Sequence, residues 1–332
     1  MPQTLIKGAG SVRQRRPDRD RTSNADTAVP VKPLVANDLI ILAALPVSFA
    51  VAWTLPASLL PSLARLFSPL AARALATRNR LVIERIERLV RDRPLACPPT
   101  MVVRELISGQ IEEYLQVLRE HRPLGWHPGM RLEGRGHVDA ALERGCGAIL
   151  WLGHFSFSAL VTKQALHRDG IETSHLTHPS HGFSRSRFGM RYLNRVRMQV
   201  EDRYLREQVM ISLHGSTRAM RELHRRLRGN GVVSLTVRER ALRPSSVRFL
   251  DGTIKVATGA ADLAYATGAT LLPVFTVREP DGHYRVVIEP PLEVRRDLPR
   301  REASDLVLRD YAARLTPYVL AYPGQWRGWM HA

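Results

Sequence analysis

The stretch GAILWLGHFSFSALVTKQALHRDG, residues 147–170, decides the fold. Its apolar run GAILWLG is typical of a strand that is buried on both faces. The segment SALVTKQALHRDG follows, has the pattern of a helix and ends at Gly170. His154 lies where the strand meets the helix, and reactive groups in open α/β sheets gather at the carboxyl ends of strands. The stretch therefore predicts a strand–helix unit with a candidate catalytic histidine at the sheet edge.

The sequence downstream repeats this alternation. IETSHLT and GVVSLTV (231–237) predict strands, and VATGAADLAYATG (256–268) predicts a small-residue helix that ends at Gly268. TLLPVFTVR and HYRVVIEP flank Asp281-Gly282, a strong hairpin turn. SDLVLRDYAARLTPYVL predicts a final helix. We therefore expect residues 124–332 to form an α/β domain, with a mixed central sheet covered by helices.

The N-terminal third has a different organisation. Residues 1–33 are polar and basic, which predicts a disordered tail. Residues 34–64 contain a charge-free run from Leu39 to Ala64, and residues 65–123 carry helical spacing of apolar residues in the segments 80–92 and 101–120. We expect residues 34–64 to attach the chain to a membrane and residues 65–123 to be helical.

The form of the membrane segment stays open at this point. A spanning helix needs about 20 apolar residues. Pro46, Pro56 and Pro61 interrupt the run, which suits a kinked transmembrane helix or a hairpin that dips into one leaflet. A buried core helix is the alternative. Arginines lie on both sides of the run, so they set no orientation, and the polar residues before it disfavour a cleaved signal peptide.

The charge balance narrows the class of partner. The chain has 332 residues and a formal net charge of +18, and arginine supplies nearly all the positive charge. Guanidinium groups bind phosphates in a forked geometry and suit anionic surfaces. No helix-turn-helix, RNA-binding or zinc-finger pattern is present, so we expect no specific nucleic-acid partner. The two cysteines, Cys97 and Cys146, are too few for a disulfide framework and are interpreted as free thiols.

Three segments together carry a family resemblance. They are LGWHPGMRLEGRGHVDAALERGCGAILWLGHF, VRFLDGTIKVATGAADLAYATGATLLPVFTVREPDGHYRVVIEPPLEV and YPGQWRGWMH. Their order and spacing resemble the lipid A late acyltransferase family, a branch of the lysophospholipid acyltransferase superfamily, over roughly Leu124 to His331. The resemblance implies a membrane-bound acyltransferase that needs no cofactor or metal. It also implies an acyl carrier protein or coenzyme A thioester as donor, a glycolipid or other amphiphilic hydroxyl as acceptor, and a place at the cytoplasmic face of a bacterial inner membrane, as in lipid A biosynthesis.

The family signature has one departure in this chain. In the family, a histidine is followed after four intervening residues by Asp or Glu; the histidine takes a proton from the acceptor hydroxyl, and the carboxylate orients it. His154 matches the histidine, whereas Ala159 occupies the acidic position. Neutralising such a carboxylate in a serine-protease triad costs about 10⁴ in turnover. Two hypotheses remain: another carboxylate replaces the missing one, or the protein is catalytically degenerate and binds lipid or acyl carrier without turnover.

Glu239 is the preferred replacement. It ends the predicted strand GVVSLTVRE, so it is expected at the same sheet edge as His154, where the family has an acidic, amide-rich segment and this chain has Arg238-Glu239-Arg240. Glu201 and Asp202 are weaker candidates. A surface glutamate paired with its neighbouring arginines is the alternative for Glu239.

The segment HPSHGFSRSRFGMRYLNRVR (178–197) is rich in arginine. The resemblance implies that an arginine downstream of the histidine meets an oxyanion or a phosphate. The candidate substrate-binding residues are Arg185, Arg187, Arg191 and Arg238; a solvated basic face is the alternative. His175, His178 and His181 recur every three residues, as metal ligands can. However, Pro179 interrupts a helix there and no carboxylate or thiolate joins them, so we expect no metal site.

Overall fold

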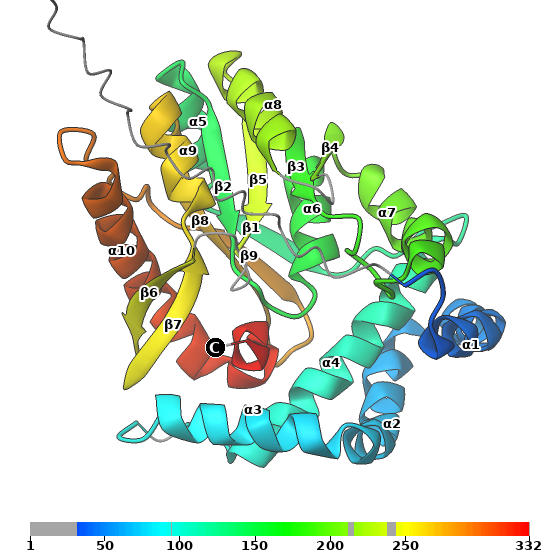
Figure 1. The fold of residues 1–332 in the computed structure, drawn as a ribbon. Helices are drawn as coiled ribbons and strands as arrows, with labels where there is room; N and C mark the ends of the chain where they lie inside the picture. The colour runs from blue at the N-terminus through cyan, green and yellow to red at the C-terminus, as the bar shows by residue number, and fades with distance from the viewer. Residues whose placement is uncertain (1–31, 94, 212–215, 238–243, 332) are drawn as a thin grey trace, which may run out of the picture. The chain divides into compact units, whose positions relative to one another are not determined.

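The central sheet is built around the strand predicted first. In the computed structural model, which describes residues 32–93, 95–211, 216–237 and 244–331, seven strands run in the order β1-β9-β8-β2-β5-β3-β4 (Figure 1). These strands are β1 (Met130–Glu133), β2 (Ala148–Leu152), β3 (Thr173–Thr177), β4 (Glu207–Met210), β5 (Val232–Thr236), β8 (Thr270–Arg278) and β9 (Tyr284–Ile288). All described residues belong to one compact unit.

The sheet is mixed, as expected. β2 pairs in parallel with β5 on one side and with β8 on the other, so it lies between neighbours and is buried on both faces. β8 and β9 are antiparallel and are joined at Asp281-Gly282, where Gly282 has a φ of 90°. This confirms the predicted hairpin, because a turn that needs positive φ favours glycine.

Side-chain alternation along the strands divides the interior into two cores. On β2, Ile149 and Trp151 contact one core, and Ala148, Leu150 and Leu152 contact the other. Helices α8 (Thr217–Arg228), α9 (Gly259–Thr267) and α10 (Arg300–Ala321) contribute to the first core, and α5 (Arg135–Glu143), α6 (Ser158–Arg168) and α7 (Asn194–Asp202) to the second. The predicted mixed α/β sheet covered by helices is therefore confirmed.

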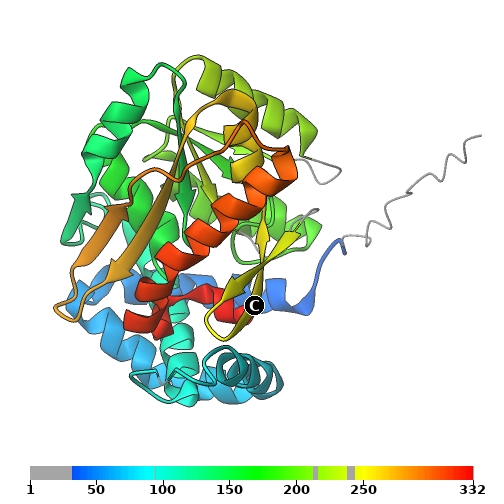
Figure 2. The same cartoon turned by 90° about the vertical axis from the view of Figure 1, so that its left-hand side faces the viewer.

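A second, smaller sheet was not predicted. β6 (Pro244–Phe249) and β7 (Gly252–Ala257) form an antiparallel hairpin beside α10 (Figure 2). Val256 and Ala257 therefore belong to a strand, and the helix predicted over 256–268 begins only at Gly259. The prediction was wrong at this end because the small residues after Ala257 continue the apolar pattern across the strand–helix boundary.

Four helices precede the sheet. They are α1 (Ala36–Thr54), α2 (Leu60–Ala74), α3 (Ala76–Leu89) and α4 (Pro99–Glu120), with a short 3₁₀ helix over Ala57–Leu59 between α1 and α2. Helix α1 ends before Pro56, since proline lacks the amide hydrogen that would continue the helix. α4 contributes side chains to both faces of the sheet and to a third core shared with α1 and α2. It thereby joins the N-terminal helices to the sheet.

Candidate active site

His154 lies directly beyond the carboxyl end of β2. Gly153 extends the pairing of this strand, because its amide donates to the Val274 carbonyl at 2.8 Å. A Cβ atom at Gly153 would lie 2.7 Å from the Phe275 ring and 3.2 Å from the Phe155 ring, so the close packing of the two rings requires glycine here. His154 is half-buried and is followed by a tight connection into α6. The structure thus places His154 at the predicted sheet edge.

The connection between His154 and α6 has an unusual backbone. Phe157 has a φ of 68°, although it is not glycine, and its side chain is buried with its ring edge-to-face on Tyr284. Side chains in this region of φ cost roughly 1–3 kcal/mol and persist only where packing holds them. The Ser158 hydroxyl donates to the Phe155 carbonyl at 2.7 Å and closes the turn. The loop that carries His154 is therefore held in a single strained shape by its own packing.

The C-terminal residues Gln325 to Trp329, which we call the C-terminal strap, hold the same loop from outside. The Arg327 amide donates to the His154 carbonyl at 2.8 Å, and the Ser156 amide donates to the Gln325 carbonyl at 2.7 Å. The Gln325 side chain accepts a hydrogen bond from the Arg278 amide and donates one to the Arg278 carbonyl, at the end of β8. Trp329 is fully buried and donates from its indole nitrogen to the Pro323 carbonyl at 2.9 Å. These contacts fix the position of the His154 backbone relative to β8.

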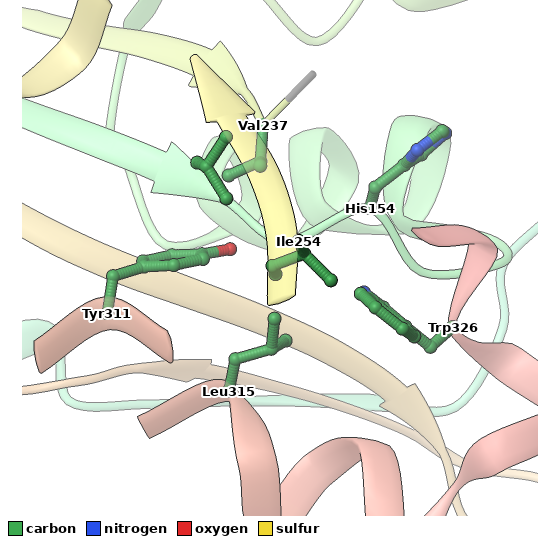
Figure 3. A pocket seen from close by; sticks show the side chains of 7 residues that line it. His154, Val237, Ile254, Tyr311, Leu315 and Trp326 are labelled. Atoms are coloured by element: carbon green, nitrogen blue, oxygen red, sulfur yellow. The ribbon is translucent and has the colours of Figure 1, made fainter. Parts of the chain in front are cut away.

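A small, mainly apolar pocket adjoins His154 (Figure 3). Its walls come from the end of β5, from β7, from α10 and from the strap; besides His154 they are Val237, Ile254, Val256, Tyr311, Leu315 and Trp326. The enclosed volume is about 10 Å³, which holds about one water molecule. An acyl chain therefore enters this pocket only if its walls move apart.

A buried ion network connects the strap to α4 and α7. Glu113 of α4 pairs with Arg327 of the strap and, at 2.5 Å, with Arg197 of α7. Arg197 also donates to Glu201 at 2.8 Å, and Glu201 is paired with the buried Lys163 of α6. Burial alone would raise the pKa of the Glu113 carboxyl, but the two guanidinium groups lower it to about 2. The network joins α4, α6 and α7 to the segment that positions His154.

The other sequence-predicted residues lie in different places. Glu201 has both carboxylate oxygens in the ion network, at hydrogen-bonding distance from Arg197, Lys163 and His181, so the network accounts for its burial. Asp202 is exposed. Ala159 is half-buried in the first turn of α6. Glu239 and Arg238 lie outside the described residues, directly after Val237, whose amide donates to the Leu152 carbonyl at 2.8 Å.

The predicted arginine cluster divides into buried and exposed members. Arg197 is buried in the ion network, which sequence reasoning missed. Arg185, Arg187 and Arg191 are exposed on the segment that contacts the start of α1, and they are not part of the lining of the His154 pocket. Their predicted role in substrate binding stays a prediction.

The three histidines after β3 have separate hydrogen-bonding partners. His175 bonds the Ser234 hydroxyl at 2.8 Å, His178 bonds Ser180 at 2.7 Å, and His181 bonds Glu201 at 2.9 Å. Over the described residues, no group of three or more histidine, cysteine or acidic side chains has an arrangement that could hold a metal ion. The regular spacing of these histidines in the sequence therefore does not bring them together in the fold.

Comparison with known proteins identifies the family of this chain. The family described as bacterial lipid A biosynthesis acyltransferase matches residues 126–331, which include every strand of the central sheet and the strap. Two curated relatives, each a phosphatidylinositol mannoside acyltransferase of Mycobacterium tuberculosis (strains H37Rv and CDC 1551), are 28% identical over 247 residues, covering 70% of this chain and 72% of the relative. The chain, an acyltransferase with a histidine-bearing α/β sheet, belongs to the bacterial lipid A biosynthesis acyltransferase family.

Proposed function

We propose that this acyltransferase moves a fatty acyl group from a thioester to a hydroxyl of a glycolipid or another amphiphilic membrane lipid, with His154 as general base. The observation that carries the proposal is the position of His154: beyond the carboxyl end of the central strand, held from two sides, on the wall of a mainly apolar pocket. General bases in open α/β sheets occupy such positions.

The proposed reaction needs only groups of this chain and its two substrates. The acceptor hydroxyl gives its proton to the His154 imidazole, and its oxygen forms a bond to the thioester carbonyl carbon. The carbon–sulfur bond then breaks, and the departing thiolate takes the proton from the imidazolium. The donor is an acyl carrier protein or coenzyme A thioester. The reaction takes place at the cytoplasmic face of the bacterial inner membrane, where both donors are found.

Glu239 is proposed as the carboxylate that orients His154. Two facts support this role: the signature position carries Ala159, whose side chain has no oxygen, and Glu239 follows Val237 of the pocket wall by two residues. Arg238 is proposed to meet the oxyanion or a phosphate of the donor. Arg185, Arg187 and Arg191 are proposed to bind phosphates of the lipid substrate.

Loss of the signature carboxylate also favours a second candidate function. In a catalytically degenerate member of the family, the apolar pocket and the arginines bind lipid or acyl carrier without turnover. Ala159 is the observation that favours it, because a missing orienting group lowers turnover by about 10⁴ in the serine-protease case.

The test is acyl transfer by the purified full-length chain. Radiolabelled acyl-coenzyme A and acyl carrier protein are offered in separate reactions with a bacterial lipid extract. We expect a labelled lipid product from one donor, and we expect Glu239→Gln to lower kcat by about 10²–10⁴. Glu293→Gln, a change at a side chain that is 82% exposed, is the matched control and is expected to leave kcat unchanged. Donor binding without product by the wild-type chain would favour the degenerate function instead.

A further inference from the structure

Helix α1 packs against the α/β unit along one narrow stripe. Among the described residues it is the one helix that is long and apolar enough to cross a membrane, and only 11% of its most apolar window is buried. The inward stripe is made of Asp38, Leu45, Phe49 and Ala52, and α1 contacts α4 and the segment Gly189–Leu193. The rest of its surface is apolar and exposed, with Ile40 66% and Val47 67% accessible to solvent. This pattern differs from that of a core helix, which would bury most of its circumference.

The start of α1 is fastened to the unit by a buried carboxylate. Asp38 is fully buried and accepts hydrogen bonds from the hydroxyls of Ser184 and Ser186 and from the Val35 amide, the last at 2.9 Å. Burial alone would raise the pKa of Asp38, but these hydrogen bonds lower it. The backbone just before α1 is hydrogen-bonded as well. The Arg187 amide donates to the carbonyl of residue 32 and the Phe188 amide to the carbonyl of residue 33, each at 3.0 Å.

The end of α1 is fastened to α4. The Trp53 indole donates to the Leu118 carbonyl at 3.0 Å. Arg119 donates from its guanidinium to the carbonyls of Ala52, at 2.8 Å, and Leu55, at 2.5 Å. These carbonyls lie at the C-terminal end of the helix, where the last carbonyls have no amide donors within the helix, so Arg119 acts as a side-chain cap.

The two attachments restrict how α1 meets a bilayer. A helix of 19 residues is about 28 Å long, close to the thickness of the hydrocarbon core. If α1 crossed the bilayer with both attachments intact, the part of the α/β unit that joins them would lie beside α1 within the membrane. Each charged side chain brought to the bilayer centre in this way would cost about 3 kcal/mol. Alternatively, α1 would have to detach and leave Asp38 without the hydroxyls of its buried site.

Helix α2 packs on the same third core as α1 and also exposes apolar side chains. Its exposed apolar side chains include Leu66, which is 73% accessible, Phe67 and Leu70, which is 66% accessible. Arg65 and Arg73 are exposed on the same helix. Figure 1 shows α1 at the right-hand edge and α2 below it at the lower right. We call the outward side chains of these two helices, among them Leu39, Ile40, Val47, Leu66, Phe67 and Leu70, the α1–α2 face.

Positive charge borders this face. Arg185, Arg187, Arg191 and Arg195 are all exposed, and they lie on the segment whose backbone is bonded to the start of α1. An apolar surface bordered by arginine complements the surface of an anionic leaflet, with acyl chains beneath lipid phosphates. A soluble protein partner would not need so large an excess of one charge around an apolar centre.

We propose that the α1–α2 face docks onto one leaflet of an anionic lipid bilayer, with α1 lying along the membrane surface instead of crossing it. The bordering arginines then meet lipid phosphates, and the segments before α1 and after α2 lie on the same side of the membrane. This docking rests on the proposed function, which supplies the lipid substrate. It deepens that function because it brings the enzyme to the membrane that holds the acceptor.

Vesicle flotation tests the docking without turnover. The full-length chain is mixed with vesicles of phosphatidylcholine alone or with one third phosphatidylglycerol. We expect strong binding to the anionic vesicles, weakened about tenfold or more by Leu66→Glu, because a buried leucine is lost and a like charge is added. Leu306→Glu on α10, at a leucine that is 41% exposed, is the matched control and is expected to bind as the wild type does. Equal binding by the two variants would overturn the proposal.

The arginine border has its own pair of variants. Arg187→Gln with Arg191→Gln is expected to weaken binding to anionic vesicles about tenfold or more, at roughly 1 kcal/mol per arginine, and to leave binding to neutral vesicles unchanged. Arg218→Gln with Arg221→Gln, two exposed positions on α8, is the control. A loss that is the same for both lipid compositions would contradict the assigned role of the border.

Cysteine labelling decides whether α1 lies on the membrane or crosses it. Leu34→Cys and Leu75→Cys are introduced separately into a chain in which Cys97 and Cys146 are alanine, and spheroplasts are treated with an impermeant maleimide before and after lysis. Both residues are exposed and flank α1 and α2. We expect both cysteines to react only after lysis, and labelling of only one in intact spheroplasts would overturn the proposal. Acyl transfer in detergent micelles separates the two claims, because it tests the reaction without the docking.

Discussion

The ion pair between Glu113 and the C-terminal strap gives the sharpest stability prediction. Glu113→Gln keeps the shape of the side chain and removes its charge, which leaves Arg327 and Arg197 facing a neutral amide. The Glu113 pKa is about 2, against an ordinary value of 4.5. A difference of this size corresponds to about 3 kcal/mol of stability at neutral pH. Removal of one partner of a buried ion pair costs about 3–5 kcal/mol, which agrees.

The assay is urea unfolding at pH 7 in a constant mild detergent, followed by circular dichroism. We expect Glu113→Gln to lower the free energy of unfolding by about 3 kcal/mol. Glu84→Gln is the matched control. The Glu84 side chain is 52% exposed and its carboxylate lies 3.8 Å from the Arg80 guanidinium, and surface pairs of this kind contribute about 0–1 kcal/mol. If Glu113→Gln and Glu84→Gln lowered stability equally, the buried network would not hold the strap as described.

Two further predictions concern the His154 loop and the response to acid. Gly153→Ala places a Cβ atom 2.7 Å from the Phe275 ring, so it should lower the free energy of unfolding by about 1–3 kcal/mol. Gly136→Ala on α5 meets nothing within 4 Å and should not lower it, because alanine favours a helix more than glycine does. Equal melting temperatures of the two variants would refute the close packing at Gly153. Because the Glu113 pKa is lowered from 4.5 to about 2, its contribution is fully present above pH 4.5 and is lost as the pH falls toward 2. The stability difference between wild type and Glu113→Gln should therefore shrink by about 2 kcal/mol between pH 6 and pH 3, and a constant difference would contradict the assignment.

Much of the sheet could be predicted because local pattern and tertiary position agree there. The apolar run ending at Leu152 is a strand buried on both faces, and Asp281-Gly282 forms the turn that its residues favour. The β6–β7 hairpin was missed although its turn contains Asp251-Gly252; the positive φ of 51° falls one residue earlier, on Leu250, where glycine or asparagine is usual. The boundary between β7 and α9 falls on Thr258, the N-cap residue of the helix, and this signal was overlooked because the small residues on both sides of it suit a helix as well.

The candidate site was predictable only in part. His154 was found because strand, helix and family signature coincide at one position. The partners of its loop were not found, because the strap lies more than 150 residues after His154 and Arg327 is 214 residues from Glu113, and a single sequence does not show such pairings. One local signal was available: Lys163 is charged in the apolar helix SALVTKQAL, and a buried lysine requires an acidic partner.

The shape of the membrane segment also depended on distant residues. The apolar run alone suited a kinked span and a hairpin equally. Asp38, at its edge, reads as an ordinary polar flank, and only the fold shows that Ser184 and Ser186 bury it. Distant polar contacts therefore carry the proposal of a helix that lies on the membrane, which hydrophobicity alone does not suggest.

The central claim is that His154 is the base of an acyl-transfer reaction, and single-turnover acyl transfer by His154→Ala tests it most directly. The purified variant is compared with wild type and with His167→Ala, a change at an exposed histidine near the end of α6, the helix that follows His154. We predict that His154→Ala lowers the rate by about 10³ or more at unchanged vesicle binding and melting temperature, and that His167→Ala transfers acyl groups at the wild-type rate. Transfer by His154→Ala at or near the wild-type rate would contradict the claim.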